Sequence, residues 1–365
     1  MPIYMDVHYI PGVAAFDVAE AHQKDLHIQA HHHCTCITYW LDVPRGAVFC
    51  LIDAPDKGTV VDMHTKAHGL IPHKILEVSQ DIVESFLGRI HDPEDAIITD
   101  KGLKIFSEPA YRVLLVADTI DHILLRHRLG QEASEKLLIG QQEALRESVS
   151  QHGGRVVEHH GGGWVASFAS AAGAVGCGLD IGSRLRESDR QKDVLRLAVS
   201  GGDPVEGSDR LFGDALQLAR RLCNLHTCGR VAVSVSVKNL LEPDFYPRHG
   251  KQLTVLAQKD ENLMNVVSDN LEKHCQDPAF GVEQFARVTM MSKSHLYRKT
   301  IELWDMSPND LLRRFRLNKA RELLRKQTTS ISGVTFDSGF TSPSYFTKCF
   351  KETFGVLPAA YLQMV

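Results

Sequence analysis

The spacing of hydrophobic and polar residues alternates between two periods along residues 1–80. Apolar residues recur at strand spacing in four runs and at helical spacing in two, namely 3–10, 37–43, 47–54 and 75–79 for the strands and 14–29 and 59–68 for the helices. Pro44-Arg45-Gly46 between the second and third strand runs is typical of a hairpin, and Gly69 is suited to end the second helix. This order of elements predicts a ferredoxin-like N-terminal domain over residues 1–80.

A polar connector with a short helical stretch is expected at 81–111. Beyond it, a buried-strand run at 113–118 begins a segment in which strands and helices alternate. The expected helices are 133–152, 171–186 and 212–224, and the further strands are 155–158, 164–168, 195–200 and 230–235. The alternation predicts an α/β middle domain over residues 112–257.

Strand signals almost vanish in residues 262–365, for which we predict an all-α domain of six or seven short helices. Breaks between these helices are expected at residues 281, 292, 307–308, 330, 339, 355 and 358. The whole chain is therefore expected to be a multidomain α+β protein.

Two helix-turn-helix units are predicted within this all-α segment. In the first, a helix at 284–288 and a turn at 289–291 precede a helix that begins at Ser292, a good N-cap residue. The arrangement recurs with a helix at 331–337, a turn around Gly339 and a helix at 342–353. In such units the second helix enters the major groove of DNA. The basic helix 308–326 between them is expected to hold the two units about one DNA turn apart, roughly 34 Å.

The composition, with 43% hydrophobic and 24% charged residues, is typical of a globular protein with hydrophobic cores. No apolar run approaches the ~20 residues that a membrane span needs. The first residues also lack the basic and apolar regions of a signal peptide. We therefore expect a cytoplasmic protein that does not engage a membrane and whose eight cysteines are reduced.

Charge and histidine are distributed unevenly along the chain. Residues 262–365 hold 14 Lys and Arg against 10 Asp and Glu, a net charge of +4, whereas the preceding residues carry −8. A basic segment on an acidic body fits a C-terminal part that contacts phosphate. Ten of the 19 histidines lie within residues 1–91, which suggests a separate function for the N-terminal part.

The C-terminal segment resembles the DNA-binding domain of the AraC/XylS family over its full length. The matching residues are Phe285-Ala286, 294–298, 316–320, Gly339-Phe340, Tyr345-Phe346, Phe350-Lys351, 354–356 and 358–361. The stretch 334–337 departs from the small apolar residues that the family has there. The resemblance implies a transcriptional regulator that binds double-stranded promoter DNA and acts with RNA polymerase. A homodimer is also expected.

The same resemblance implies that DNA is contacted by the exposed faces of the second helices of the two units. The residues on these faces are Ser292, Lys293, Ser294, His295, Arg298, Lys299, Thr341, Ser342, Ser344, Tyr345 and Lys348. Any single lysine or arginine among them is as well suited to a phosphate as to a base edge.

Residues 112–257 resemble the class III nucleotide cyclases, in which two aspartates bind two metal ions. Asp118 matches the first aspartate, whereas Gly162 stands at the position of the second. Glu158 replaces a base-selecting lysine and Gln217 a transition-state asparagine, while Arg221 matches the catalytic arginine. Because glycine supplies no carboxylate to the magnesium ions, we expect no catalysis and no catalytic cofactor. A dimerisation scaffold is the preferred role, and nucleotide binding through Asp118 and Arg221 or weak cyclase activity are alternatives.

Histidines of the N-terminal segment form a candidate metal site. His64 and His68 lie four residues apart on one helix, the spacing at which two imidazoles bind one ion. Helical spacing turns His22 toward the sheet, and His8 lies on the first strand in phase with Asp6. Imidazole suits zinc, copper, nickel and iron, so the type of ligand does not select the metal.

The N-terminal segment resembles a small ferredoxin-like family described as nickel-binding. The matching residues lie at 5–8, 21–22, 38–40, 48–51, 54–55 and 64–69. The resemblance implies a bound nickel ion or a similar divalent transition metal. The run 27–36 departs from the family pattern. The residues 31–36 within it, three histidines beside Cys34 and Cys36, are additional candidate ligands, and so is Cys50.

These features favour a regulator in which a metal or nucleotide signal from the first two domains alters DNA binding by the third. Two alternatives are a nucleotidyl cyclase that its C-terminal domain recruits to DNA, and a metal-binding storage protein.

Overall fold

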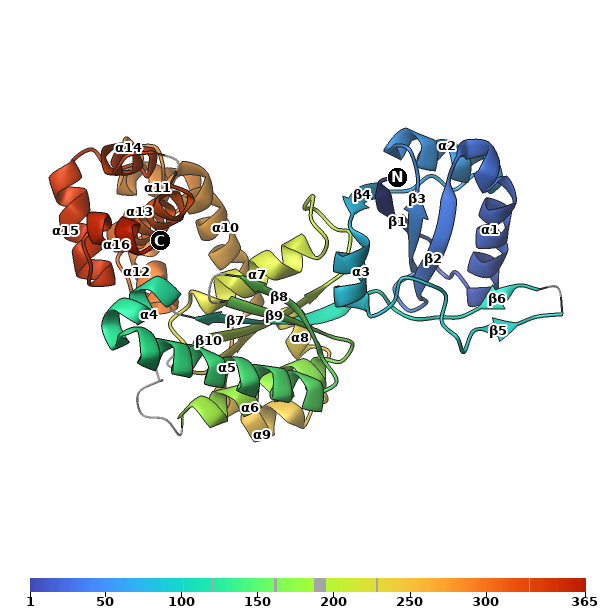
Figure 1. Cartoon of the computed structure of the whole chain (residues 1–365), viewed down its shortest axis with the longest axis horizontal. Coiled ribbons are helices and arrows are strands. Elements are labelled where there is room, and N and C mark those ends of the chain that lie inside the picture. The colour runs from blue at the N-terminus through green and yellow to red at the C-terminus, as the bar shows by residue number, and fades with distance from the viewer. Residues whose placement is uncertain (101, 120, 161–162, 187–194, 228, 328) are drawn as a thin grey trace.

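The computed structural model describes residues 1–100, 102–119, 121–160, 163–186, 195–227, 229–327 and 329–365. They form an N-terminal sheet with its helices, a connector, a central sheet between helices, and a C-terminal group of helices. In Figure 1 the N-terminal part and the C-terminal helices lie on opposite sides of the central sheet. None of the described helices is both long enough and apolar enough to cross a membrane.

The N-terminal sheet has four antiparallel strands in the order β2-β3-β1-β4. Its elements are β1 (Ile3–Tyr9), α1 (Ala15–Ile28), β2 (Thr35–Asp42), β3 (Ala47–Asp53), α2 (Lys57–Ala67) and β4 (Lys74–Val78). Side chains of β1 alternate between two faces: Tyr4 packs in the core with α1 and α2, whereas Met5 and Val7 pack in the core shared with the central part. The order of strands and helices is the predicted ferredoxin-like one.

The connector is more ordered than its polar sequence predicts. It contains α3 (Gln80–Leu87) and a small hairpin of β5 (Ile97–Ile98) and β6 (Lys104–Ile105). The guanidinium of Arg89 lies 4.4 Å from the Trp40 ring centroid and donates hydrogen bonds to Thr38 Oγ1 and to the carbonyl oxygen of Tyr39, both at 2.7 Å. These contacts fasten the connector to the N-terminal sheet.

The central sheet has six strands in the order β12-β11-β10-β7-β9-β8. The strands are β7 (Arg112–Thr119), β8 (Arg155–His160), β9 (Gly163–Phe168), β10 (Leu195–Gly202), β11 (Val231–Val233) and β12 (Leu253–Val255). The helices are α4 (His122–Leu129), α5 (Gln131–Gln151), α6 (Ala171–Arg186), α7 (Gly213–Cys223), α8 (Val235–Lys238) and α9 (Phe245–His249). Leu114 and Val116 of β7 face α7, and Val113 and Leu115 face α5 and α6, so helices cover both faces (Figure 1).

The described C-terminal residues form seven helices, in agreement with the six or seven expected. They are α10 (Gln258–His274), α11 (Val282–Val288), α12 (Lys293–Trp304), α13 (Pro308–Lys326), α14 (Ile331–Asp337), α15 (Pro343–Phe354) and α16 (Pro358–Met364). Helix α10 begins before residue 262, where we predict the domain to begin. Helix α13 has the predicted bounds, and its 19 residues span about 28 Å.

Asp121 joins the central part to the C-terminal helices. Its buried carboxylate caps α4, accepts a hydrogen bond from the Tyr361 hydroxyl at 2.6 Å and pairs with Arg325 at 2.8 Å. Burial by itself raises the pKa of Asp121, but Tyr361 and the arginines outweigh it and hold the pKa below its usual value. The contacts fix α13 and α16 against α4.

Candidate DNA-binding surface and metal centre

The first helix-turn-helix unit consists of α11, a tight turn and α12. The Oγ atom of Ser292 accepts a hydrogen bond from the His295 amide at 3.2 Å, so Ser292 is the predicted N-cap. Phe285 of α11 and Leu296 of α12 are fully buried in one core. Packing on this side leaves the opposite face of α12 exposed.

The second unit, α14 and α15, repeats this construction. Ser342 Oγ accepts a hydrogen bond from the Tyr345 amide at 3.3 Å, and Phe346 is fully buried. Val334 and Thr335, in the stretch that departs from the AraC/XylS pattern, are also fully buried, so the helix forms and packs despite the departure. Gly339 in the turn has a φ of 87°, a conformation that favours glycine.

The predicted contact residues lie on the outer faces of α12 and α15. Nine of the eleven are exposed: Ser292, Lys293, Ser294, His295, Arg298, Thr341, Ser344, Tyr345 and Lys348. Ser342 is half-buried, as its capping role requires. Lys299 is also half-buried, and its ammonium lies 2.8 Å from both Asp260 and Glu302. Ion pairs within the protein therefore engage Lys299 in this structure.

Much of the positive charge of α13 is used inside the protein. Arg316 donates hydrogen bonds to three backbone carbonyl groups between residues 275 and 280. Arg314 donates to the carbonyl of Asn224 at 3.2 Å, and Arg325 pairs with Asp121. The basic sequence of this helix thus serves to position the two units.

We expect Arg298→Ala and Lys348→Ala each to weaken binding to a selected DNA site by about 1–3 kcal/mol if these exposed cations contact bases. Fluorescence anisotropy with a labelled duplex measures the change. Lys136→Ala, at an exposed lysine of α5, is the control because it removes a positive charge that belongs to neither unit. If wild type and all three variants bind the duplex with equal affinity, Arg298 and Lys348 do not contact DNA.

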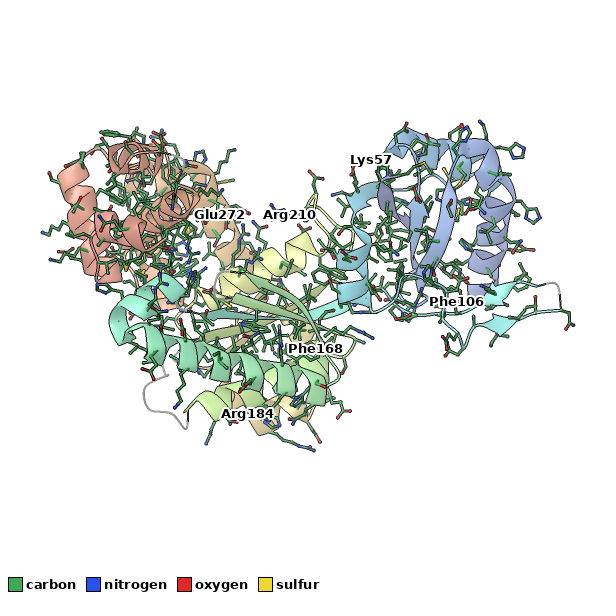
Figure 2. The ribbon with its side chains drawn as sticks, viewed as in Figure 1. Lys57, Phe106, Phe168, Arg184, Arg210 and Glu272 are labelled. Atoms are coloured by element: carbon green, nitrogen blue, oxygen red, sulfur yellow. The ribbon has the colours of Figure 1, made fainter. Side chains whose placement is uncertain are left out.

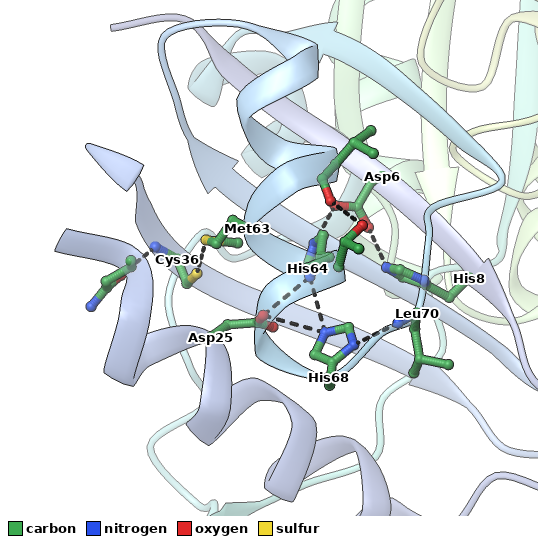
Figure 3. A network of polar contacts seen from close by, with 11 residues as sticks. Asp6, His8, Asp25, Cys36, Met63, His64, His68 and Leu70 are labelled. Carbon is green, nitrogen blue, oxygen red and sulfur yellow. Dashed lines mark hydrogen bonds and ion pairs between the residues drawn. The ribbon is translucent and has the colours of Figure 1, made fainter. Parts of the chain in front are cut away.

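A cluster of buried polar side chains lies between β1 and α2. His64 Nε2 is 3.0 Å from Asp6 Oδ2, and His8 Nε2 is 3.2 Å from Asp6 Oδ1 (Figure 3). Ligand atoms of Asp6, His8, Cys50 and His64 all lie within 4.8 Å of one another, and all four residues are buried. Alternation along β1 places Asp6 and His8 on the same face, and His64 projects from α2 toward them.

A second group shares His64 with the first. His64 Nδ1 lies 3.2 Å from Asp25 Oδ1 of α1 and 3.0 Å from His68 Nε2. His68 Nε2 is 3.3 Å from the same Asp25 oxygen, and its Nδ1 accepts a hydrogen bond from the Leu70 amide at 3.1 Å. The spacing of His64 and His68 on α2 therefore brings the two imidazoles together, as predicted.

The electrostatics of the cluster are dominated by two buried carboxylates around one imidazole. Burial disfavours charge on His64, but Asp6 and Asp25 raise its pKa to about 10. Burial also raises the pKa of Asp6, yet His64 and His8 outweigh it and the pKa is lowered. Burial raises the pKa of the Cys50 thiol. The cluster is thus a histidinium between two carboxylates when no metal is bound.

The donor set fits a borderline transition metal. Imidazole, thiolate and carboxylate groups suit nickel, zinc, copper and iron, whereas magnesium and calcium prefer oxygen alone. Asp6 Oδ1 and His8 Nε2 are buried and lack hydrogen bonds to the described residues, although the two atoms lie close together. Unsatisfied buried polar atoms are costly, and a shared cation would satisfy both. His8, His64, Asp6 and Cys50 would hold such an ion.

The sequence identifies part of this centre. His8, His64 and His68 belong to the clusters, and Cys50, predicted only as an additional ligand, belongs to the first. His22 lines the adjacent cavity of about 370 Å³ and lies against Tyr39 of the sheet, with ring centroids 5.2 Å apart. It is not among the residues that meet within ligand distance in the described part of the chain.

Asp6 and Asp25 are the functional candidates that sequence reasoning missed. Asp6 is two residues before His8 on a strand, and Asp25 is three residues after His22 on a helix, so each shares a face with a predicted ligand. These spacings were signals that could have identified both carboxylates.

Among the described residues, none of the side chains of the run 31–36 belongs to either group that lies within ligand distance. Cys34 and Cys36 are buried in the hydrophobic core, where Cys36 Sγ lies 3.8 Å from Met63 Sδ. His32 Nδ1 is 3.2 Å from Asp62 at the surface of α2. The seven described cysteines are all free and buried.

In the central part, Asp118 lies at the exposed end of β7. Arg221 of α7 is instead buried: Nη2 lies 2.6 Å from Asp269 and 2.9 Å from Glu272, both on α10. Gly162 and the side chain of Glu158 lie outside the described residues. Acidic groups of the C-terminal part thus engage the arginine that we predicted to bind a nucleotide.

Two family models match parts of the chain. Residues 285–364 match the model described as a helix-turn-helix domain, and residues 4–78 match the one described as nickel responsive protein SCO4226-like. The chain therefore carries an AraC-type helix-turn-helix domain at its C-terminus and a SCO4226-like domain at its N-terminus.

Curated relatives match over about a third of the chain. It is 29% identical over 134 residues to histidine kinase P4 of Formosa agariphila, and 30% identical over 136 residues to the HTH-type transcriptional regulator CdhR of Pseudomonas aeruginosa. It is 34% identical over 127 residues to "Putative adenylate cyclase 3" of Rhizobium meliloti. These matches cover 34%, 36% and 33% of this chain and 10%, 39% and 22% of the relatives, in that order.

Among solved structures, the DNA-binding domain of AdpA, determined in complex with a target DNA, is 31% identical to the matched part. The match covers 28% of this chain and 89% of that domain, with a TM-score of 0.26. The crystal structure of SCO4226 from Streptomyces coelicolor is 30% identical, covers 21% of this chain and 94% of that protein, and has a TM-score of 0.20.

Proposed function

We propose that this protein is a transcriptional regulator that binds specific sequences in double-stranded DNA through α12 and α15. The observation that carries the proposal is the pair of helices with serine N-caps, each with an exposed polar face and each braced by a buried apolar face. Such helices enter successive major grooves when they are held about one DNA turn apart. A regulator of this kind would act with RNA polymerase, and a homodimer would extend the bound site.

We further propose that a metal ion, nickel or a similar divalent transition metal, binds at Asp6, His8, Cys50 and His64 and alters DNA binding. The donor types and the unsatisfied atoms of Asp6 and His8 support this part of the proposal. His64 would exchange its proton for the ion, and Asp25 and His68 would orient it. No catalytic role is assigned to the central domain, because a glycine at 162 supplies no carboxylate.

The metal cluster is linked to the central part through Lys74. This residue of β4 pairs in register with Val7 of β1, between Asp6 and His8. The Lys74 ammonium donates to the backbone carbonyls of residues 206, 207 and 208 at 2.7, 2.9 and 2.6 Å. A shift of β1 on metal binding would therefore be transmitted to the loop that precedes α7.

The next link runs from α7 to the DNA-binding part. Arg221 near the end of α7 binds Asn265, Asp269 and Glu272 of α10. Helix α10 packs against α11 and α13, so a displacement of α7 would alter how the two units are oriented. A ligand can shift this orientation only if it binds the two arrangements with different affinity.

Lys74→Met should uncouple the two ends of the chain, because methionine keeps the length of the side chain but donates no hydrogen bonds. An allosteric coupling is typically worth about 1–3 kcal/mol, and we expect most of it to be lost while nickel binding persists. The measurement is DNA affinity with and without nickel. Lys66→Met removes a lysine of α2 that pairs with Asp62 of the same helix, and it should retain the coupling.

The proposed function itself is tested with the purified full chain. DNA is selected from a random pool, and its affinity is then measured in chelator and in nickel. Specific binding that changes with nickel is the expected result. Specific binding with the same affinity in chelator and in nickel would contradict only the proposed metal response. If no DNA is retained in either condition, the proposal that the protein is a transcriptional regulator is wrong.

A further inference from the structure

A wide cleft lies where the three parts of the chain meet. Its volume is about 1160 Å³, and it is lined by β4 and α3 on one side, by α7 at its floor and by α10 on the other side. Figure 2 labels Arg210 and Glu272, which mark the cleft from the central part and from the C-terminal part. Neither a predicted DNA-contact residue nor a metal ligand lines this cleft.

The lining combines an apolar wall with charged side chains of both signs, namely Arg210, Arg220 and Arg221 and the carboxylates of Glu77, Asp209 and Glu272. Ile82 and Phe86 of α3, Leu216 of α7 and Trp304 of α12 provide apolar and aromatic surface. Arg210 is exposed at the rim and makes no ion pair with the described residues. The apolar wall suits the apolar body of a ligand, and an anionic group on that ligand would have to pair with one of the arginines.

The cationic end of the cleft already holds two carboxylates of the chain. Glu272 accepts hydrogen bonds from Gln217 at 3.0 Å and from Arg221 at 2.9 Å, and Asp269 pairs with Arg221 at 2.6 Å. The Arg221 side chain is only 8% exposed, whereas Asp269 and Glu272 are 63% and 44% exposed. A buried cation such as Arg221 needs an anion beside it. Because the two carboxylates are exposed, the anionic group of a ligand can take the place of one of them.

We propose that this cleft binds a small organic anion with an aromatic or aliphatic body, whose charged group competes with Glu272 for Arg221 and Gln217. When one anion replaces another, Arg221 remains paired. The favourable free energy of binding therefore comes from burial of the ligand's apolar body. The exchange frees α10 from α7. Its consequence for DNA binding rests on the proposed function, whereas the binding site itself does not.

The probe for this site is 8-anilinonaphthalene-1-sulfonate, an aromatic anion that fluoresces when it is shielded from water. We expect saturable binding of the dye to the full chain. Glu272→Gln removes the competing charge and should tighten the dye severalfold. Ile82→Glu places a carboxylate in the cleft at a side chain that is 48% exposed, and it should weaken the dye by about tenfold.

The matched control is Ile139→Glu, the same substitution at a 55% exposed isoleucine of α5, on the other side of the central sheet. It should leave the dye affinity unchanged. Dye binding that is absent, or that is equal in wild type, Glu272→Gln and Ile82→Glu, overturns the proposal. Because no DNA is present, a failure of the regulator hypothesis would not affect these results.

Discussion

The His64→Gln variant should lose about 3–5 kcal/mol of the unfolding free energy of the N-terminal domain in the absence of metal. His64 is the common partner of Asp6 and Asp25, two carboxylates that are almost completely buried. Glutamine carries no charge, so both buried carboxylates would lose the cation that they share. Urea unfolding monitored by fluorescence of the fully buried Trp40 measures the loss.

The same variant should bind nickel at least about 100-fold more weakly. Loss of a residue that only hydrogen-bonds to a metal ligand already lowers metal affinity by about 10- to 100-fold. His31→Gln is the matched control, since His31 is exposed and outside both clusters. An unfolding curve equal to that of wild type would show that His64 does not neutralise the two carboxylates.

The Gly339→Ala variant should destabilise the C-terminal domain by about 2–5 kcal/mol. Gly339 adopts a φ of 87°, and a Cβ atom added there would lie 2.2 Å from the carbonyl oxygen of Cys275. That oxygen also accepts a hydrogen bond from Arg316, so neither partner can move without loss. The substitution therefore combines backbone strain with a clash.

Gly355→Ala separates the two contributions. Gly355 has a φ of 79°, but an added Cβ meets nothing within 4 Å. Only the strain remains, and we expect a loss of about 1–2 kcal/mol. Thermal unfolding measures both variants, and equal losses would show that contact with Cys275 is unimportant.

The sequence predicts most helices and strands because their apolar spacing is regular. Helix α6 and helix α14 begin and end where the pattern predicts. Helix α4 was not predicted, because its short sequence mixes basic and apolar residues without a clear face. It is held by Asp121, whose partners Arg325 and Tyr361 come from the other end of the chain.

In the candidate sites, the sequence predicts contacts only between residues that are close together in the chain. His64 and His68 are four residues apart, so sequence alone indicates that they meet. Asp6 and Asp25 approach His64 only after the sheet and its two helices assemble. Lys299 pairs with Asp260, and Arg221 pairs with Asp269 of α10. These partners are distant in the sequence, so local spacing does not predict the pairs.

The most direct test of the account is the DNA sequence that the full chain selects from a random pool. Two conserved half-sites about one helical turn apart are expected, with Arg298→Ala relaxing one half-site and Lys348→Ala the other. A pool that shows no enriched sequence, or one that is the same for wild type and both variants, would contradict the claim that α12 and α15 contact DNA bases.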